Sequence, residues 1–324
     1  MRVFVTGGNG FIGSVVVRKL VERGDKVRCL LRETSKTDRI DGLDFERAIG
    51  DVRDSASIRK GMEGCDGVIH LASLSSWNDI HSPMMDAVVI GGTANVLDAA
   101  TALGKIRTVF VSSSIAVSAS REPKLHDETS KHSLKLDEYV YAKAKVEAEK
   151  LCRRAKDAGL PVVIVNPCEV YGPNDTAFIT ASNLVDFAKS NPVLVCDGGT
   201  SVVYVDDVAA GIIAALDKGT PGERYILGGD NLTVRQLAEL TVDILGQRKR
   251  VVGLPNRLVS MVAKVGGALH VPLPFNPAVI PYATLYWFMD NEKAKRDLGV
   301  KFRSARETLE PTLAWLREAG HVRS

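Results

Sequence analysis

A tyrosine and a lysine four residues apart are the clearest candidates for chemistry in this chain of 324 residues. Tyr141 and Lys145 share one face of the helix that the pattern of residues 139–158 predicts. An ammonium group near a phenol favours the phenolate and lowers its pKa, so this tyrosine is suited to giving and taking a proton near neutral pH. A second pair, Tyr139 and Lys143, has the same spacing, and spacing alone does not choose between the two pairs.

Three consecutive serines, 112–114, stand at the end of an apolar run that predicts a strand over residues 108–112. In open α/β sheets, ligands bind beyond the carboxyl ends of the strands. A hydroxyl placed there can donate to a carbonyl oxygen as negative charge develops on that oxygen. The alternative interpretation is a serine-rich turn without a catalytic role.

The start of the chain indicates where a nucleotide binds. An apolar strand over residues 3–6 leads into Gly7-Gly8-Asn9-Gly10-Phe11-Ile12-Gly13, and a helix pattern follows as far as Gly24. Glycines in such a turn permit positive φ and a close approach of the backbone to a pyrophosphate. The N–H groups and the dipole at the start of the helix favour phosphate. Because a strand precedes the glycines and a helix follows them, the motif predicts dinucleotide binding.

Composition excludes several other classes of protein. The formal net charge is +3 and the charges are dispersed, which argues against nucleic-acid binding. The five cysteines contain no C-x-x-C pair and the six histidines are scattered, so neither a disulfide framework nor a metal site is predicted. No run is long and apolar enough to predict a membrane span, and no signal peptide is recognised. We therefore expect a cytoplasmic protein.

The elements that must position these residues alternate between strand and helix. Near-continuous apolar runs are typical of parallel strands that are buried on both faces, and they fall at residues 3–6, 27–31, 45–49, 67–71, 108–112 and 162–166. Helix patterns between them include residues 93–103 and 139–158. This alternation predicts an α/β protein with a doubly wound parallel sheet of the Rossmann type.

The second half of the chain is predicted to interleave with the first. We expect residues 1–172 to form the nucleotide-binding domain, to which 202–228 return as a strand, a helix and a further strand. Residues 173–201 and 229–324 are expected to form mainly a smaller C-terminal substrate domain.

The segment 256–289 is unusually apolar. One interpretation is a pair of core helices joined by a proline-rich connection. The other is an apolar wall or lid over a substrate cleft, or a contact with a membrane surface.

Taken together, the motifs resemble those of a known family. The motifs are Thr6–Gly13 with its glycine pattern, His70-Leu71-Ala72, Ser112-Ser113-Ser114, Tyr141-x-x-x-Lys145 and Tyr204-Val205-Asp206-Asp207-Val208, in that order. In this order they are similar to those of extended short-chain dehydrogenases/reductases, in the NAD-dependent epimerase/dehydratase superfamily. The resemblance covers essentially the whole chain.

The resemblance implies roles for individual residues. The run Lys145-Val146-Glu147-Ala148-Glu149 matches the family pattern and selects Tyr141 as the acid/base, with Ser114 as the catalytic hydroxyl. Lys145 is implied to bind the nicotinamide ribose and to lower the pKa of the tyrosine. The implied cofactor contacts are Tyr141, Lys145, Thr6, Gly7, Gly10, Phe11, Ile12, Gly13, Asp51, Val52, Leu71, Ala72, Ser73 and Pro167.

The end of the second strand predicts which dinucleotide binds. A carboxylate at that place would bind the ribose 2′-hydroxyl of NAD, but Leu31 stands there and is followed by Arg32. Glu33 points the other way in an extended strand, and Lys36 adds positive charge. Because arginine suits a 2′-phosphate, Arg32 and Lys36 predict NADP(H), with NAD as the alternative.

Departures from the family pattern reduce the number of reactions that we expect this chain to catalyse. No Asp-Glu pair follows the serines, which argues against a sugar dehydratase, and Val89 stands where many members have asparagine. Nucleotide-sugar enzymes usually have Arg-Pro where this chain has Asn166-Pro167, and an arginine before the Asp-Asp pair where residues 199–203 contain none. Without the arginine before the Asp-Asp pair, a charge-assisted clamp on a diphosphate is missing. The segments Asn166–Glu169 and Gly222–Gly229 resemble those of the dihydroflavonol 4-reductase group. The chain is also similar to hopanoid-associated proteins that carry a sugar-epimerase label.

The sequence therefore predicts an NADP(H)-dependent reductase or dehydrogenase that moves hydride to or from a small, partly apolar substrate. The alternatives are a nucleotide-sugar 4-epimerase with tightly bound NAD and a non-catalytic NADP-binding sensor. A homodimer is implied by the resemblance alone. The residues expected to contact the substrate are Ser75, Trp77, Ser114, Asn166 and Glu169.

Overall fold

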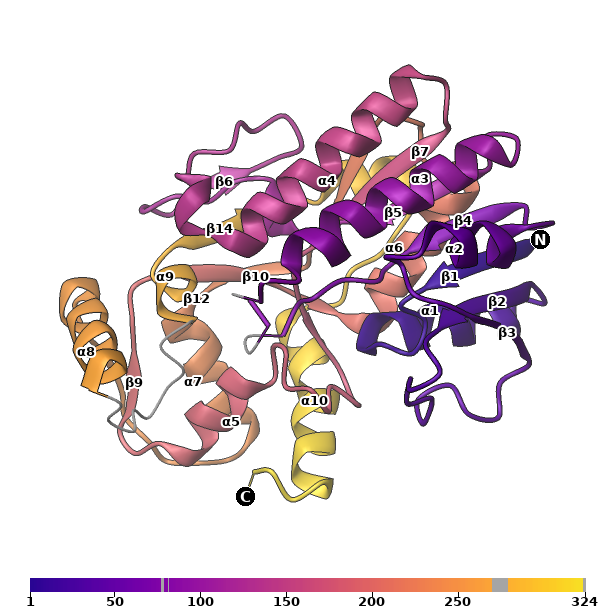
Figure 1. The fold of residues 1–324 in the computed structure, drawn as a ribbon. Helices are drawn as coiled ribbons and strands as arrows, with labels where there is room; N and C mark the ends of the chain where they lie inside the picture. Colours follow the sequence, from indigo (N-terminus) through magenta and orange to yellow (C-terminus); the bar gives the residue numbers. More distant parts are fainter. Residues whose placement is uncertain (77–78, 81, 270–278, 323–324) are drawn as a thin grey trace.

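The computed structural model describes residues 1–76, 79–80, 82–269 and 279–322, and the side chains of 264–269 are not described (Figure 1). Trp77, which the sequence placed among the substrate contacts, lies outside the described residues, as does the proline-rich stretch 271–275.

A seven-stranded parallel sheet forms the first lobe, in the order β11-β7-β5-β4-β1-β2-β3. The chain runs outward from β1 to β3 and then returns to β4 on the other side of β1, so the direction of winding reverses between β1 and β4. The carboxyl ends of these two strands border the crevice where doubly wound sheets bind ligands. The expected fold is confirmed, with strands β1 Arg2–Thr6, β2 Lys26–Leu31, β3 Phe45–Ile49, β4 Gly67–His70, β5 Arg107–Val111, β7 Val162–Pro167 and β11 Arg224–Leu227.

Helices cover both faces of this sheet because alternate side chains of its strands point to opposite sides. Val3 and Val5 pack in one core cluster with α1 (Phe11–Glu22) and α6 (Val205–Lys218). Phe4, between them, packs in a second cluster on the other face. The helices of that face are α2 (Ser55–Met62), α3 (Gly92–Ala102) and α4 (Val140–Asp157), and the π-helical turn Asp86–Gly91 leads into α3.

A second sheet lies under the carboxyl ends of the first. Its order is β12-β10-β14-β6, and β8 pairs in parallel with β10. The strands are β6 Leu125–His126, β8 Glu169–Tyr171, β10 Gly199–Tyr204, β12 Asp230–Thr233 and β14 Tyr286–Met289. A separate core cluster joins this sheet to α5 (Ser182–Lys189), α7 (Val234–Ile244), α10 (Ala305–Glu318) and the parallel pair β9 (Val193–Val195) and β13 (Val251–Gly253).

The two lobes exchange segments at two points. Strand β7 of the first sheet continues almost directly into β8 of the second, and β10 of the second sheet continues into α6, which covers the first. The sequence predicts that residues 202–228 return to the first domain. Helix α6 and strand β11 do lie on the first sheet, whereas the strand at the start of this range, β10, belongs to the second sheet. The domain division itself stays a prediction.

The apolar segment 256–289 differs from a simple pair of helices. It contains α8 (Asn256–Leu269) and a single-turn helix α9 (Ile280–Ala283), but its last part is strand β14. Strand β14 pairs with β10 on one side and with β6 on the other. Tyr286-Trp287-Phe288 therefore extends a sheet, as aromatic residues favour. The short helical turns that remain are Ser114–Ala116, Leu136–Glu138 and Ala294–Leu298.

Candidate active site

The glycine turn between β1 and α1 leaves room for a ligand backbone. Gly7 has φ +71°, and a Cβ there would lie 2.7 Å from the backbone nitrogen of Ala72. A Cβ at Gly13 would overlap the carbonyl oxygen of Gly7, so glycine is required for the helix to start this close to the strand.

The N-terminus of α1 is open to an anion. Gly10 occupies the N-cap position, where no side chain caps the helix, and the first turn contains no acidic residue. The free N–H groups and the positive end of the helix dipole therefore have no anionic partner in the described part of the chain. This cradle fits the pyrophosphate of a dinucleotide.

A hydrogen-bonded chain through His70 fixes the loop that faces the glycines. The backbone N–H of Ala72 donates to the Thr6 hydroxyl (3.2 Å), and that hydroxyl is hydrogen-bonded to Nδ1 of His70 (2.6 Å). Nε2 donates to the Thr93 hydroxyl (3.1 Å), which donates to the carbonyl of Val89 (2.6 Å). Because the Thr93 proton goes to Val89, Nε2 of His70 must be protonated, and in the neutral imidazole Nδ1 accepts from Thr6.

Burial keeps this imidazole neutral. Together with the nearby positive charge of Lys145, it lowers the pKa of His70 to about 3. The backbone of Leu71 also bonds to the carbonyl of Thr6 (3.0 Å). Leu71 and Ala72 are thus held beside the glycine turn, where the sequence placed them as cofactor contacts; their role stays a prediction.

Helix α4 brings Tyr141 and Lys145 to the carboxyl end of β5. Lys145 is only 2% exposed, and its Nζ donates to the carbonyl of Val111 (3.0 Å) while lying 5.9 Å from the centre of the Tyr141 ring. The competing pair is not assembled, because Lys143 is exposed and pairs with Asp137 (2.7 Å). The structure thus joins the pair that the family pattern selects.

The protonation of this pair differs from the expectation. Burial raises the pKa of Tyr141 to about 12, and the nearby hydroxyls of Ser73 and Ser113 oppose this rise without cancelling it. Burial therefore dominates, and the net pKa of Tyr141 in this structure is raised, not lowered as predicted. The ammonium bonds to the carbonyl of Val111, and burial lowers the pKa of Lys145 itself to about 8.

The serines near Tyr141 interact with different side chains. The hydroxyls of Ser73 and Ser113 face the phenol of Tyr141, whereas Ser114 interacts with the thiol of Cys168. The structure therefore brings Ser113, rather than the predicted Ser114, to the tyrosine. Sequence reasoning missed Ser113 because three adjacent serines do not reveal which one faces α4. The catalytic assignment stays a prediction for both residues.

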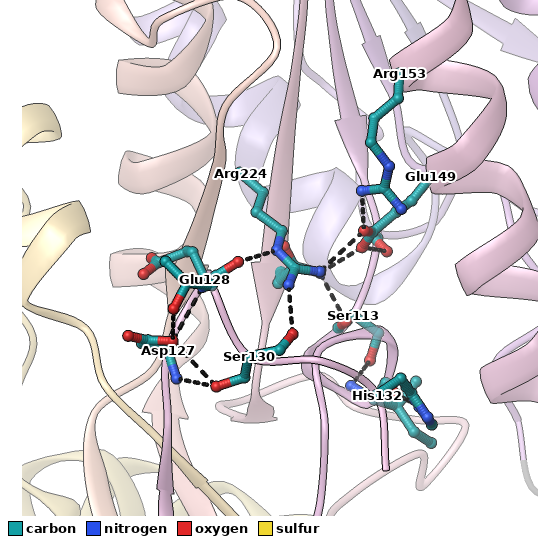
Figure 2. Close-up of polar contacts among 12 residues, drawn as sticks. Ser113, Asp127, Glu128, Ser130, His132, Glu149, Arg153 and Arg224 are labelled. Carbon is teal, nitrogen blue, oxygen red and sulfur yellow. Dashed lines mark hydrogen bonds and ion pairs between the residues drawn. The ribbon is translucent and has the colours of Figure 1, made fainter. Parts of the chain in front are cut away.

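The buried carboxylate of Glu149 lies close to Ser113 and between two arginines (Figure 2). The side chain of Glu149 is 1% exposed and accepts hydrogen bonds from the Ser112 hydroxyl and the Asn166 amide, both at 2.7 Å. Arg153 (3.2 Å) and Arg224 (3.3 Å) neutralise its charge. One side chain of α4 is thereby bonded to the ends of β5 and β7 and to β11.

Arg224 extends this network to a loop. Figure 2 shows its guanidinium between Glu149 and the residues that precede α4. Nε donates to the carbonyl of Glu128 (2.8 Å) and Nη2 to that of Ser130 (3.2 Å). The carboxylate of Glu128 in turn accepts from the backbone of Ile226 (2.9 Å). The loop before α4 is therefore anchored to β11.

Two predicted substrate contacts have structural partners instead. Asn166 is fully buried, and its amide donates to the carbonyl of Ser113 (2.9 Å) as well as to Glu149 (2.7 Å). This corrects the expectation of a substrate contact, because the side chain lies behind the serines. Glu169 accepts from the Tyr171 hydroxyl (2.8 Å) and the Asn183 amide (2.9 Å) in the second lobe, and burial raises its pKa.

Near the end of β2, positive side chains are exposed. Arg32 makes no ion pair within the described residues, and Lys36 is held near the glycine turn because its carbonyl accepts from the Asn9 amide (2.9 Å). Asp51 is paired with Arg53 (2.8 Å), which lowers its pKa to about 2, and the charge of Arg32 contributes.

The remaining predicted contacts lie at or after the carboxyl ends of strands in the first sheet. Val52 is buried and bonded through its carbonyl to α3, Pro167 ends β7, and Ser75 is exposed in the loop after β4.

An aromatic wall, defined here as Tyr139, Tyr282 and Trp287, stands beside Tyr141. Tyr139 and Tyr282 meet edge to face with ring centres 5.2 Å apart, and Tyr282 stacks on Trp287 at 6.2 Å. Burial raises the pKa of Tyr282, and the nearby phenols of Tyr139 and Tyr141 add to that shift. The C-terminal apolar segment therefore reaches Tyr141, in line with the wall interpretation.

Comparison with known proteins identifies relatives of this arrangement. Residues 3–228 match the model of the NAD dependent epimerase/dehydratase family. The chain is 30% identical over 331 residues to a Synechocystis protein provisionally named dihydroflavonol 4-reductase, covering 99% of this chain and 96% of that protein. It is 32% identical over 330 residues to the 4-hydroxy-2-methyl-3-oxo-4-farnesyl-3,4-dihydroquinoline-1-oxide ketoreductase of Stigmatella aurantiaca, covering 99% and 97%.

A solved structure shows the same fold over the whole chain. The crystal structure of gox2253 superposes with a TM-score of 0.84 at 30% identity and covers 99% of both chains.

The Glu149 network predicts that alanine substitutions at two nearby glutamates, Glu149 and Glu147, differ in their effect on stability. Glu149→Ala leaves the largely buried Arg224 without its counter-ion and removes one acceptor of the buried Asn166 amide, so we expect the free energy of unfolding to fall by about 3 kcal/mol or more. Glu147→Ala removes only an exposed pair with Lys150 and is expected to change it by less than about 0.5 kcal/mol. Urea denaturation of both variants measures this, and equal losses would contradict the network.

The neutral His70 predicts a pH dependence of stability. Its folded pKa, about 3, is below the unfolded value, so the unfolded chain takes up a proton first as the pH falls. The contribution of the neutral His70 to the free energy of unfolding is complete above about pH 6.5. It is lost toward about pH 3, at about 1.4 kcal/mol per pH unit. Denaturation of the wild type and of His70→Gln at pH 7, 6 and 5 compares the slopes. A variant as pH-sensitive as the wild type over this range would refute the assignment.

Proposed function

The chain belongs to the NAD dependent epimerase/dehydratase family, and we propose that it is an NADP(H)-dependent reductase of a small, ring-bearing carbonyl compound with apolar surface. Members of the family bind a nicotinamide cofactor, so the chain is an enzyme of the extended short-chain dehydrogenase/reductase type that acts on a small molecule. The observation that carries the proposal is the placement of the Tyr141 phenol near serine hydroxyls and the Lys145 ammonium, at the strand ends that face the glycine turn.

The protonation state of Tyr141 suits reduction. Its pKa of about 12 keeps the phenol protonated at neutral pH, which is the form that donates a proton to a carbonyl oxygen as that oxygen gains negative charge. When bound, the reduced nicotinamide supplies the hydride. The hydroxyls of Ser113 and Ser114 are the candidates to hold the substrate oxygen in line with the phenol.

Lys145 supports the proton transfer without taking part in it directly. With a pKa of about 8, its ammonium is mostly charged at neutral pH. It lies 5.9 Å from the centre of the Tyr141 ring, close enough to stabilise the phenolate that remains after the proton has left. Its bond to the carbonyl of Val111 fixes its direction, and we assign it the nicotinamide ribose as a second partner.

The preference for NADP(H) is supported by the charges near the end of β2. Arg32 is exposed and follows Leu31, and Lys36 lies on the loop that Asn9 ties to the glycine turn. A guanidinium binds a phosphate through parallel, charge-assisted hydrogen bonds. We assign these two side chains to the 2′-phosphate.

The substrate class is supported by the aromatic wall and by the relatives. Tyr139, Tyr282 and Trp287 offer ring faces next to the proton donor, and aromatic side chains pack well against flat apolar rings. Both named relatives carry reductase names that refer to ring ketones. A nucleotide-sugar 4-epimerase remains the alternative, but the strand that leads to Asp206 and Asp207 has no arginine for a diphosphate.

Replacement of the catalytic phenol tests the mechanism. Tyr141→Phe removes the proton donor and is expected to lower kcat by about 10²–10⁴-fold while NADPH still binds. Tyr139→Phe is the matched control, because Tyr139 precedes α4 and faces Tyr282. Turnover of a cyclic ketone and calorimetric titration with NADPH measure both quantities. Unchanged kcat in Tyr141→Phe would overturn the assignment.

Replacement of Arg32 tests the cofactor preference. Arg32→Ala is expected to weaken NADPH binding by about 10–100-fold, the loss of a charge-assisted contact, and to leave NADH binding unchanged. Arg18→Ala, an exposed arginine on α1, serves as the charge control. The proposal fails if the wild type binds NADH at least as tightly as NADPH.

A further inference from the structure

Exposed apolar side chains gather at one end of the second lobe. Nine large apolar side chains in the described residues are exposed, and five of them belong to β9, β13 and α8. These five, called the α8 patch here, are between 37% and 57% exposed: Leu194, Val252, Leu258, Met261 and Val262. Figure 1 shows α8 at the outer edge of the molecule, opposite the β1–β3 edge of the parallel sheet.

The sequence of α8 explains why this surface stays uncovered. Val259 and Ala263 form its buried face and pack against Ile280. Leu258, Met261 and Val262 lie at i, i+3 and i+4 and form a second apolar face, which points to solvent. An amphipathic surface helix carries polar residues at such positions, so this face is suited to an apolar contact.

The neighbouring strand pair adds to the same surface. Val193 and Val195 of β9 point into the core, which turns Leu194 between them outward. Leu194 pairs with Val252 of β13, whose side chain is also exposed. Strand β13 ends only three residues before α8 begins.

The segment that carries α8 is rich in basic side chains, although the exposed Asp197 also lies beside the start of the helix through backbone bonds to the Asn256 side chain. Residues 244–289 contain five basic side chains and no acidic one, although the net charge of the chain is only +3. Arg248, Arg250 and Arg257 are exposed and make no ion pair within the described part of the chain. Arg250 and Val252 are two residues apart along an extended segment and so share a face.

We propose that the α8 patch docks on the surface of an anionic lipid bilayer. Apolar side chains of this kind enter the boundary between headgroups and acyl chains, and arginines at the rim reach the lipid phosphates. Each basic side chain near such a surface adds attraction. No helix of the described residues has the length and apolarity to cross a bilayer, so the contact is peripheral.

Charge argues against a second copy of this chain as the occupant. In a two-fold symmetric dimer through the patch, the same surface would face itself and bring the arginines of both copies together. Like charges at that distance oppose association, whereas lipid phosphates neutralise them.

Docking would place the active site where apolar substrates accumulate. The segment that contributes α8 continues to Tyr282 and Trp287, which stand beside Tyr141. The docked face and the aromatic wall thus belong to one stretch of chain. This consequence rests on the proposed function, but the docking itself does not.

Vesicle flotation with the full chain tests the docking. We expect binding to vesicles of equal parts phosphatidylcholine and phosphatidylglycerol, weaker binding as salt is raised, and little binding to phosphatidylcholine alone. Equal binding to both vesicles, or binding to neither, would overturn the proposal. Reductase assays are not needed for this readout, so failure of the proposed activity would leave the flotation result intact.

Variants locate the contact. Leu258→Ser combined with Met261→Ser is expected to abolish flotation. Arg248→Gln combined with Arg250→Gln is expected to weaken it by about fivefold for each arginine. Exposed residues far from the patch serve as controls, with Leu125→Ser matching the apolar change and Arg59→Gln with Lys60→Gln matching the charge change.

Unchanged flotation in the patch variants, or equal loss in the controls, would contradict the assignment. Analytical ultracentrifugation adds a further outcome: a dimer that Met261→Ser dissociates, without vesicle binding by the wild type, would identify a protein interface instead and overturn the proposal.

Discussion

The buried carboxylate of Glu149 is the constraint on which the rest of the site depends. A charge that is 1% exposed is tolerated only when its oxygens are hydrogen-bonded and its charge is neutralised. Its partners, Ser112, Asn166 and Arg224, belong to three different strands or strand ends. Satisfying one carboxylate therefore fixes helix α4 against the sheet, and Asn166 transmits that position to the backbone of Ser113.

The same burial sets the protonation of the groups nearby. A low-dielectric surrounding disfavours charge, so His70 is neutral and Tyr141 stays protonated well above neutral pH. Lys145 stays mostly charged at neutral pH because the negative charge of Glu149, one helical turn away, raises its pKa against the effect of burial. The arrangement pairs a proton donor with a cation that stabilises its conjugate base, next to a glycine turn that fits a dinucleotide.

The sequence predicts much of this and fails where tertiary contacts decide. Apolar runs locate the parallel strands, and the glycines and the Tyr141–Lys145 spacing locate the site. The strand at 202–205 is recognised, but its pattern does not say that it pairs in the second sheet. The orientation of Ser113 and the raised pKa of Tyr141 depend on burial between distant elements. Glu149 stands in the family pattern, yet its partner Arg224 is 75 residues away.

The balance of hydride between cofactor and substrate tests the central claim most directly. The purified chain is incubated with NADPH and a cyclic apolar ketone, and both NADPH and the alcohol product are measured. A reductase consumes one NADPH for each alcohol formed and is purified without bound, non-exchanging NAD. Conversion of a nucleotide sugar to its 4-epimer with no net change in cofactor absorbance, by a chain that retains NAD through purification, would contradict the account.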